Sequence, residues 1–146
     1  MKNVLYPGSF NPFTIGHADI VKRALKIFDH IYIAISINPN KYIDDEELQK
    51  RFNNIKEIYK NDSRVTVIVN KDLVETCAKI YQCSAIVKGV RNSEDLTDEL
   101  IQCEINRYIG DIETILIPTQ AKYAHVSSTL VRTLMKTGLD YSEFIP

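Results

Sequence analysis

The sequence has little of what marks several other classes of protein. It has 146 residues, no tryptophan, five glycines, five prolines and a formal net charge of only −1. A charge this close to zero gives no basic surface for nucleic acid or for an anionic membrane, so we expect neither as a partner. No apolar run approaches the ~20 residues of a membrane-spanning helix, and the chain begins on a strand-like pattern with no signal-peptide pattern before it.

Cysteine is also scarce, and two common nucleotide-binding motifs are missing. Cys77, Cys83 and Cys103 are odd in number and lack C-x-x-C spacing, which disfavours a disulfide framework or a zinc site. We therefore expect reduced cysteines and a cytoplasmic protein. Neither G-x-x-x-x-G-K-[ST] nor G-x-G-x-x-G occurs, which excludes the usual P-loop and dinucleotide fingerprints.

What the chain does contain is a regular alternation of two patterns. Short apolar runs, most of them rich in valine and isoleucine, cover residues 4–6, 31–37, 65–69, 85–87 and 114–117. Near-continuous apolar runs of this length are typical of parallel strands that are buried on both faces. The segments between them have helical spacing, and strands alternating with helices indicate a doubly wound sheet. We predict an α/β protein with a five-stranded parallel sheet, forming one domain over residues 1–146.

Three of the expected helices have recognisable ends. Asp72 is expected to cap a helix that runs through Tyr81, and residues 95–108 form a longer helix. Ser127 is expected to cap the last helix, because a serine side chain accepts a hydrogen bond from a free N–H of the first turn.

The most informative stretch is Tyr6-Pro7-Gly8-Ser9-Phe10-Asn11-Pro12-Phe13-Thr14-Ile15-Gly16-His17. Pro7-Gly8 breaks the first strand, and Gly16-His17 opens the first helix. A helix N-terminus presents unbonded N–H groups and the positive end of the helix dipole, which suits an anion and above all a phosphate. The imidazole of His17 can donate a hydrogen bond to a phosphate oxygen there, so His17 is the first candidate for a functional residue.

Ligands of doubly wound sheets bind beyond the carboxyl ends of the strands, so polar residues that follow other strands are candidates as well. Lys41 follows the second run and supplies a mobile positive charge. Lys88-Gly89-Val90-Arg91 follows the fourth run, where two cations can face one anion and Gly89 allows either a close backbone approach or a positive φ. Val126-Ser127-Ser128-Thr129 opens the last helix and makes a second anion site plausible.

Glu99 and Asn106 lie close to two turns apart in the expected helix and share one of its faces. The spacing alone leaves two readings open, a solvated helix face and a functional one.

Together these segments, in this order and spacing, resemble the family of bacterial phosphopantetheine adenylyltransferases, from residue 4 to about residue 134. The first motif alone is shared by much of the Rossmann-like nucleotidyltransferase superfamily, whereas its combination with the Lys-Gly-Val-Arg and Ser-Ser-Thr segments is specific. The resemblance implies a Rossmann-like fold and the transfer of AMP from ATP to 4′-phosphopantetheine, giving dephospho-coenzyme A and pyrophosphate in coenzyme A biosynthesis. It also implies Mg²⁺ and a homohexamer.

The resemblance further implies a role for each candidate residue. The catalytic residues would be His17, Lys41 and Arg91. The ATP-binding residues would be Ser9, Phe10, His17, Lys88, Gly89, Arg91, Glu99, Tyr123, Ser127, Ser128 and Thr129. The residues that bind the second substrate would be Ser9, Lys41, Asp72, Leu73, Val74, Lys88 and Asn106. No side chain is expected as a metal ligand, because no carboxylate cluster is present and Mg²⁺ is commonly held by phosphates and water.

Three alternatives stay open on the sequence. The protein could be another nucleotidyltransferase, acting on nicotinamide mononucleotide or, with CTP, on glycerol phosphate; the Lys-Gly-Val-Arg and Ser-Ser-Thr context argues against this. It could be a nucleotide-binding module without turnover, against which the presence of His17, Lys41 and Arg91 argues. A nucleic-acid binder fits least, because the charge is balanced and no basic stripe is present.

Overall fold

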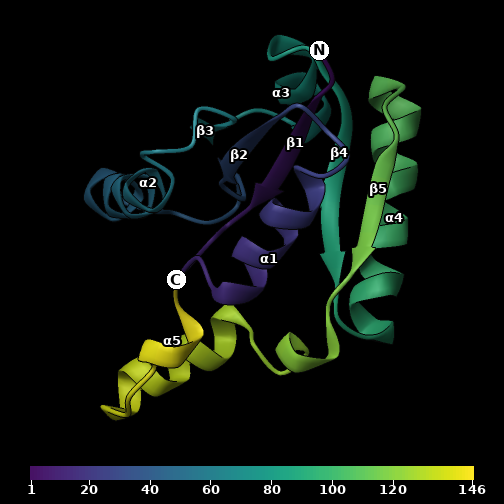
Figure 1. The fold of residues 1–146 in the computed structure, drawn as a ribbon. Helices are drawn as coiled ribbons and strands as arrows, with labels where there is room; N and C mark the ends of the chain where they lie inside the picture. Colours follow the sequence, from purple (N-terminus) through teal and green to yellow (C-terminus); the bar gives the residue numbers. More distant parts are fainter.

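Five parallel strands form one sheet in the order β3-β2-β1-β4-β5, in a computed structural model that describes residues 1–146 (Figure 1). The strands are β1 (Asn3–Gly8), β2 (His30–Ser36), β3 (Val65–Asn70), β4 (Cys83–Val90) and β5 (Thr114–Pro118). All neighbouring strands pair in parallel. The strand order reverses its direction between β1 and β4, which makes this the topological switch point where ligands of such sheets bind. The predicted doubly wound, five-stranded parallel sheet is confirmed.

Two buried clusters show how helices cover the two faces of the sheet. Ile20 and Ile55, from α1 (Ile15–Ala24) and α2 (Asp45–Ile58), pack with Val4 in one cluster. Cys77, from α3 (Val74–Ile80), packs with Leu5 in the other. Side chains alternate between the faces along a strand, so the consecutive residues Val4 and Leu5 serve opposite layers.

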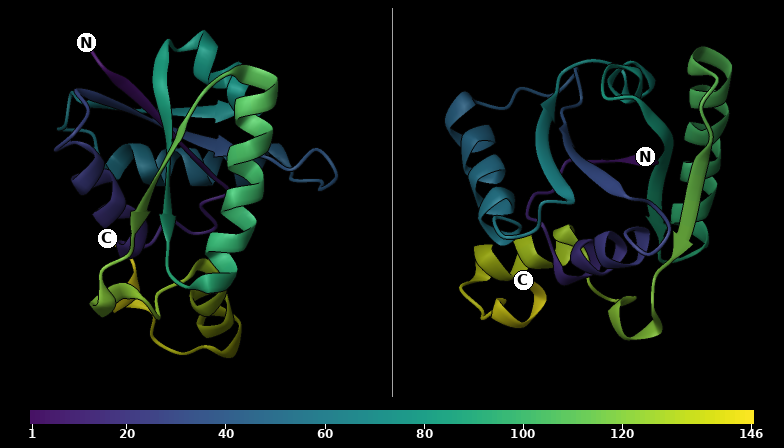
Figure 2. Two further views of the ribbon diagram at one scale, coloured as in Figure 1. Left: turned by 90° about the vertical axis from the view of Figure 1, so that its right-hand side faces the viewer. Right: turned by 45° about the horizontal axis from the view of Figure 1, so that its top comes forward.

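The two remaining α-helices lie on the α3 face and at one end of the sheet. The long helix α4 (Ser93–Gly110) contacts α3 and β4. The left view of Figure 2 shows β5 leaving the C-terminal end of α4 at an angle to the helix. The last α-helix, α5 (Ser128–Thr137), lies at the end of the sheet to which the arrows of β4 and β5 point (Figure 1). Two short 3₁₀ helices cover Ala121–Tyr123 and Ser142–Phe144. None of the helices combines the length and the hydrophobicity that a membrane crossing requires.

The predicted cap of α3 is wrong. Helix α3 begins at Val74 with Leu73 as its N-cap, and no side chain caps it. The backbone of Asp72 is held instead by Asn70, whose side chain accepts a hydrogen bond from the N–H and donates one to the carbonyl oxygen of Asp72, both at 3.0 Å. Because of this turn, α3 begins two residues after Asp72.

The other two helix starts agree better with the prediction. The Ser127 hydroxyl accepts a hydrogen bond from the N–H of Leu130 at 3.0 Å, so the predicted cap of α5 is confirmed. Helix α4 is longer than predicted, because Asn92 caps it through the N–H of Asp95 and the first turn begins at Ser93.

Candidate active site

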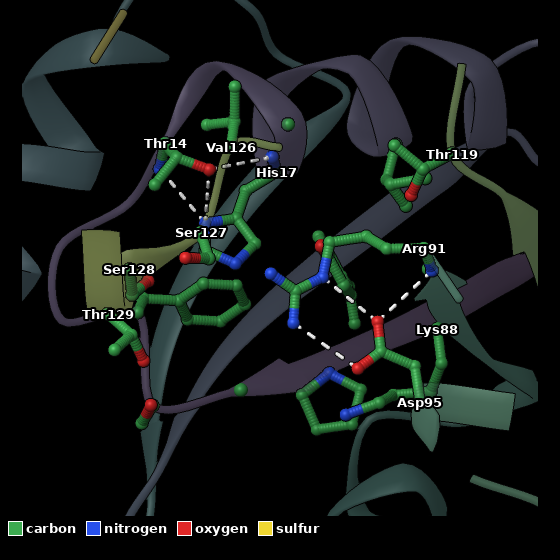
Figure 3. Close-up of a pocket in the computed structure, with 18 of the residues that line it drawn as sticks. Thr14, His17, Lys88, Arg91, Asp95, Thr119, Val126, Ser127, Ser128 and Thr129 are labelled. Carbon is green, nitrogen blue, oxygen red and sulfur yellow. Dashed lines mark hydrogen bonds and ion pairs between the residues drawn. The ribbon is translucent and has the colours of Figure 1, made fainter. Parts of the chain in front are cut away.

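A cleft of about 330 Å³ opens beyond the carboxyl ends of β1 and β4, between the N-termini of α1 and α5 (Figure 3). All the predicted ATP-binding residues except Tyr123 line it. They are Ser9, Phe10, His17, Lys88, Gly89, Arg91, Glu99, Ser127, Ser128 and Thr129. The fold therefore brings together residues that lie more than a hundred positions apart in the chain.

The position of His17 is fixed by the cap of its own helix. Thr14 is the N-cap of α1, and its hydroxyl accepts a hydrogen bond from the His17 N–H at 3.3 Å. In return, the backbone N–H of Thr14 donates to Nδ1 of His17 at 2.9 Å. This is a capping box in which histidine takes the place usually held by glutamate or glutamine. Because Nδ1 accepts a hydrogen bond, the ring proton is assigned to Nε2, the only other ring nitrogen.

The surroundings of His17 keep its imidazole neutral. The ring packs edge-on against Phe10, with 5.0 Å between the ring centroids, and lies 5.3 Å from the centroid of Phe13. Burial among these rings, reinforced by the positive charges of Lys88 and Arg91, lowers the pKa of His17 to about 4. A neutral imidazole with its proton on Nε2 is a hydrogen-bond donor at neutral pH that needs no prior protonation.

The loop before α1 is shaped by Phe10. Phe10 is buried and has a positive φ of 47°, a conformation that is costly for a residue with a bulky side chain. A Cβ atom added to Gly8 would stand 2.9 Å from the Phe10 ring, so only glycine fits beneath the ring. Strained residues of this kind cluster at functional sites, and here the strained residue is the one that shields His17.

Two cations reach the cleft from the end of β4, and both are paired with carboxylates of α4. Nζ of Lys88 lies 3.3 Å from Oε1 of Glu99. The guanidinium of Arg91 donates two parallel hydrogen bonds to Asp95, at 2.9 and 3.2 Å (Figure 3). Burial would raise the pKa of the Asp95 carboxyl, but hydrogen bonds from Arg91 and the charges of Arg91 and Lys88 outweigh it and lower this pKa. The cleft therefore presents two cations held in place by carboxylates to an anionic ligand.

Gly89 lies between these cations and allows a close approach, as one of the two readings of the sequence expects. The other reading, a positive φ, is wrong, because Gly138 is the only glycine with a positive φ. A Cβ atom at Gly89 would come within 3.1 Å of Cγ1 of Ile20. The glycine thus lets α1, which carries His17, pack tightly against β4, which carries Lys88.

The N-terminus of α5 forms the opposite wall with its hydroxyl residues. Ser127 caps the helix, and Ser128 donates to the carbonyl oxygen of Pro12 at 2.8 Å. Arg132, which the sequence analysis did not single out, also lines this wall. Its guanidinium donates to the carbonyl oxygen of Asn11 at 2.6 Å and to the Thr129 hydroxyl at 3.1 Å. It follows Ser128 by four residues, so helical spacing alone could have placed it on the same face.

A second, smaller cleft of about 150 Å³ adjoins the first. Pro7, Gly8, Ser9, Lys88 and Glu99 line both clefts. Val74 and Asn106, two of the residues predicted for the second substrate, line the smaller one. Asn106 is almost fully buried, yet its side-chain amide makes no hydrogen bond within the chain. Glu99 and Asn106 do share a face of α4, as the spacing predicts.

The smaller cleft also contains polar groups that the sequence analysis missed. Gln102 lies between Glu99 and Asn106 on the same face of α4, and Ser36 stands at the end of β2. Oγ1 of Thr114, at the start of β5, is buried without a hydrogen-bond partner. Gln102, Thr114 and Asn106 give the cleft free hydrogen-bonding capacity, which a ligand that carries amides would use.

Four of the predicted residues are not brought to either cleft. They are Lys41, Asp72, Leu73 and Tyr123. Lys41 lies exposed in the loop between β2 and α2, and Leu73 is 60% exposed. Tyr123 belongs to the first 3₁₀ helix, where the Lys122 ammonium lies 5.0 Å from its ring centroid. The predicted roles of these four residues stay predictions.

The site offers few groups to a metal ion. The chain has no cluster of three or more histidine, cysteine, aspartate or glutamate side chains that could hold one. Asp95 and Glu99, the carboxylates that line the larger cleft, are both engaged by cations. A cation that binds here would depend on ligands other than side chains.

A neutral histidine at a helix N-terminus, facing paired cations at the switch point of a parallel sheet, defines a nucleotidyltransferase-type site. The model of the cytidylyltransferase-like family matches residues 5–134. Phosphopantetheine adenylyltransferases from Flavobacterium psychrophilum and Bacteroides thetaiotaomicron are each 40% identical to this chain, over all of it and over 96% of their own length. The enzyme of this name from Oenococcus oeni is 34% identical over the whole chain and 92% of its own length.

A solved structure supports the fold. It is assigned as a nicotinate-nucleotide adenylyltransferase from Vibrio parahaemolyticus and superposes with a TM-score of 0.66 over 99% of this chain and 87% of its own, at 21% identity. At this identity the likeness concerns the fold alone. The matches over the full length establish that the chain belongs to the cytidylyltransferase-like family and, within it, to the phosphopantetheine adenylyltransferases.

Proposed function

We propose that this protein transfers AMP from ATP to 4′-phosphopantetheine, giving dephospho-coenzyme A and pyrophosphate. The observation that carries the proposal is the shared wall of the two clefts. Ser9, Lys88 and Glu99 line both, so a nucleotide in the larger cleft and a second substrate in the smaller one would meet beside Ser9 and Lys88. The names and full-length similarity of the relatives support the same reaction.

The reaction needs no covalent intermediate with the enzyme. An ionised phosphate oxygen of the acceptor attacks the α-phosphorus of ATP in line, a new P–O bond forms, and the bond to the β-phosphate oxygen breaks to release pyrophosphate. The protein has to hold two anions together and stabilise the charge of the transition state. Nε2–H of His17, at the N-terminus of α1, donates a hydrogen bond to an oxygen of the α-phosphate as that charge develops.

The rest of the larger cleft binds the triphosphate. Arg91 suits phosphate oxygens because its guanidinium offers several donors in a fixed plane. Lys88, at the wall shared by the clefts, provides a point charge between the reacting phosphates. Across the cleft, Ser127 and its neighbours in the first turn of α5 supply hydroxyl groups, and Arg132 adds a third cation.

The smaller cleft accepts the arm of 4′-phosphopantetheine. This arm carries two amides on a chain of apolar carbons, and it requires a few polar groups in a partly apolar site. Asn106 and Gln102 offer amides that can donate and accept, and Val74 provides apolar contact.

We include Mg²⁺ in this proposal as an ion bound through the substrate. The ion prefers octahedral oxygen ligands and keeps several waters, so phosphate oxygens and water suffice to hold it in a site without a carboxylate cluster. When bound, it neutralises part of the triphosphate charge. Removal of divalent cations with EDTA should abolish pyrophosphate release, and added Mg²⁺ should restore it.

We also propose that the chain forms a homo-oligomer, a hexamer if it follows the resemblance. The support is an exposed apolar surface on α4. It is formed by Ile101, Ile105, Tyr108 and Ile109, and each of these side chains is between 41% and 92% exposed. A contiguous apolar surface of this kind usually marks an interaction site.

A cytoplasmic location is part of the proposal. All three cysteines are free, and Cys77 and Cys103 are buried. Free thiols of this kind are typical of proteins in a reducing compartment.

The function is tested by measuring pyrophosphate release from ATP and Mg²⁺ with different acceptors. The proposal predicts release that depends on 4′-phosphopantetheine, with dephospho-coenzyme A formed in equal amount. Nicotinamide mononucleotide, nicotinate mononucleotide and glycerol phosphate (the last with CTP as well as ATP) serve as controls and should give no more than background. Release that depends on one of the controls instead would assign the protein to another nucleotidyltransferase activity.

A further inference from the structure

Asp95 holds Arg91 at three points. Its carboxylate accepts hydrogen bonds from Nε of Arg91 at 2.9 Å and from Nη2 at 3.2 Å. The same carboxylate accepts a third hydrogen bond, from the backbone N–H of Arg91, at 3.1 Å. Figure 3 shows these contacts on the β4 side of the cleft. One carboxylate thus fixes both the main chain and the guanidinium plane of Arg91.

Asp95 is itself held in place by the start of α4. Its N–H donates to the side-chain oxygen of Asn92, the N-cap, at 2.9 Å. Its carboxylate therefore stands in the first turn of an 18-residue helix, where the helix dipole favours a negative charge. Hydrogen bonds from Arg91 lower the pKa of this carboxyl despite its partial burial, so it is ionised at neutral pH.

The hydrogen bonds to Asp95 leave one edge of the Arg91 guanidinium free. Nη1 makes no hydrogen bond within the chain, whereas Nε and Nη2 both point at Asp95. In Figure 3 the unbonded end of the guanidinium faces the side of the cleft formed by His17 and Ser127. This is the side on which the triphosphate would lie.

We propose that Asp95 is a positioning residue, which holds the guanidinium of Arg91 with its free edge toward the triphosphate of ATP. The inference rests on the proposed function. An arginine side chain loses much rotational freedom when it binds a ligand, and a side chain that is already ordered loses less. Charge alone predicts the opposite role, in which a carboxylate close to a phosphate site competes with the nucleotide for Arg91. The two roles predict opposite changes in ATP affinity when the charge is removed.

The test is a double-mutant cycle on Asp95 and Arg91, with binding of a non-hydrolysable ATP analogue measured by calorimetry. Asp95→Asn should weaken binding about tenfold in the wild-type background, in the range found for residues in direct contact. In the Arg91→Ala background it should cause no loss of affinity, because its orienting effect passes through Arg91 and the unpaired Asp95 carboxylate there only repels the triphosphate. Glu94→Gln removes the same charge from the same helix turn without touching Arg91, and it should leave affinity within about twofold of wild type.

Each other outcome overturns the inference. Unchanged or tighter binding by Asp95→Asn would show that Asp95 does not orient Arg91 or that it competes with the nucleotide. An equal loss in both backgrounds, or an equal loss in Glu94→Gln, would assign the effect to the helix. If Asp95→Asn does not fold, Asp95→Glu replaces it: the charge stays, the carboxylate moves by one methylene, and the same pattern is expected. A wild-type protein that does not bind the analogue would refute the proposed function itself.

Discussion

The backbone N–H of Thr14 donates a hydrogen bond to Nδ1 of His17, with 2.9 Å between the two nitrogens. A single main-chain contact thus decides which ring nitrogen carries the proton and how the ring is turned. Together with the low pKa of His17, it makes Nε2–H a fixed neutral donor in the cleft. The residue that caps α1 and the residue proposed to act on the α-phosphate are therefore parts of one local structure.

This arrangement predicts a pH dependence of folding stability. The pKa of His17 falls from its ordinary value of 6.5 to about 4 in the folded protein. Between these values the unfolded chain binds a proton that the folded protein does not, so the free energy of unfolding falls as the pH drops from 6.5 toward 4. The loss from this residue is about 3 kcal/mol over the whole window.

His17→Gln is the matched variant for this measurement, because glutamine can form the same capping box but does not titrate. Denaturant unfolding at several pH values between 4 and 7 should show a flatter curve for the variant than for wild type. His30, whose pKa burial also lowers, contributes equally to both proteins and cancels in the difference. Parallel curves would show that His17 is not held neutral by the fold.

Arg91→Ala should weaken binding of a non-hydrolysable ATP analogue by about 10- to 100-fold, the range for hydrogen bonds to a charged partner. Lys88→Ala should cause a smaller loss, since lysine lacks the planar fork. Each variant also leaves a carboxylate of α4 without its cation, Asp95 or Glu99, which adds repulsion to the triphosphate. Calorimetric titration measures the affinity of each variant for the analogue. Unchanged affinity in both variants would show that Arg91 and Lys88 do not bind the triphosphate.

Asn106→Ala should raise KM for 4′-phosphopantetheine by about three- to tenfold, as expected for one lost hydrogen bond, and leave ATP binding unchanged. Its melting temperature should stay close to that of wild type, because the Asn106 amide makes no hydrogen bond within the chain. Asn54→Ala, the same substitution on the exposed surface of α2, is the control. A rise in KM for ATP instead would place Asn106 at the nucleotide.

Ile105→Glu should dissociate the proposed oligomer, because it puts a charge into the exposed apolar surface of α4. Ile105 is 41% exposed in the single chain. Ile27→Glu introduces the same change at a position 63% exposed on a different surface and should leave the assembly intact. Molar mass from light scattering after gel filtration separates the outcomes. A wild-type protein that is monomeric at micromolar concentration would contradict the proposal.

The parts of the fold that depend on local patterns were predictable. Valine- and isoleucine-rich runs gave the five strands, and a hydroxyl before an amphipathic segment located the start of α5. The cap of α3 was predicted wrongly because Asn70 competes for the backbone of Asp72, and this contact depends on a turn that no periodicity reveals. The cap of α1 by Thr14 was not predicted, because the usual sequence signal of a capping box is a glutamate or glutamine three residues after the threonine, and here that residue is His17.

The candidate site was predictable as far as residues follow strand ends. Lys88, Arg91 and Ser127 converge because parallel strands all end at one edge of the sheet. The pairing of Lys88 with Glu99 was not predictable, because it depends on how α4 lies against β4. The position of Lys41 was not predictable either. Lys41 follows β2, but it lies exposed in the loop between β2 and α2 and lines neither cleft.

The most direct test of the account is the effect of His17→Ala on kcat compared with its effect on ATP binding. A donor that acts on the transition state contributes to kcat and little to the affinity of the ground state. The account predicts a fall in kcat for pyrophosphate release of about 100-fold or more, with the dissociation constant of the ATP analogue changed only a few-fold. A variant with near-normal kcat, or one whose entire loss lies in ATP binding, would contradict the role assigned to His17.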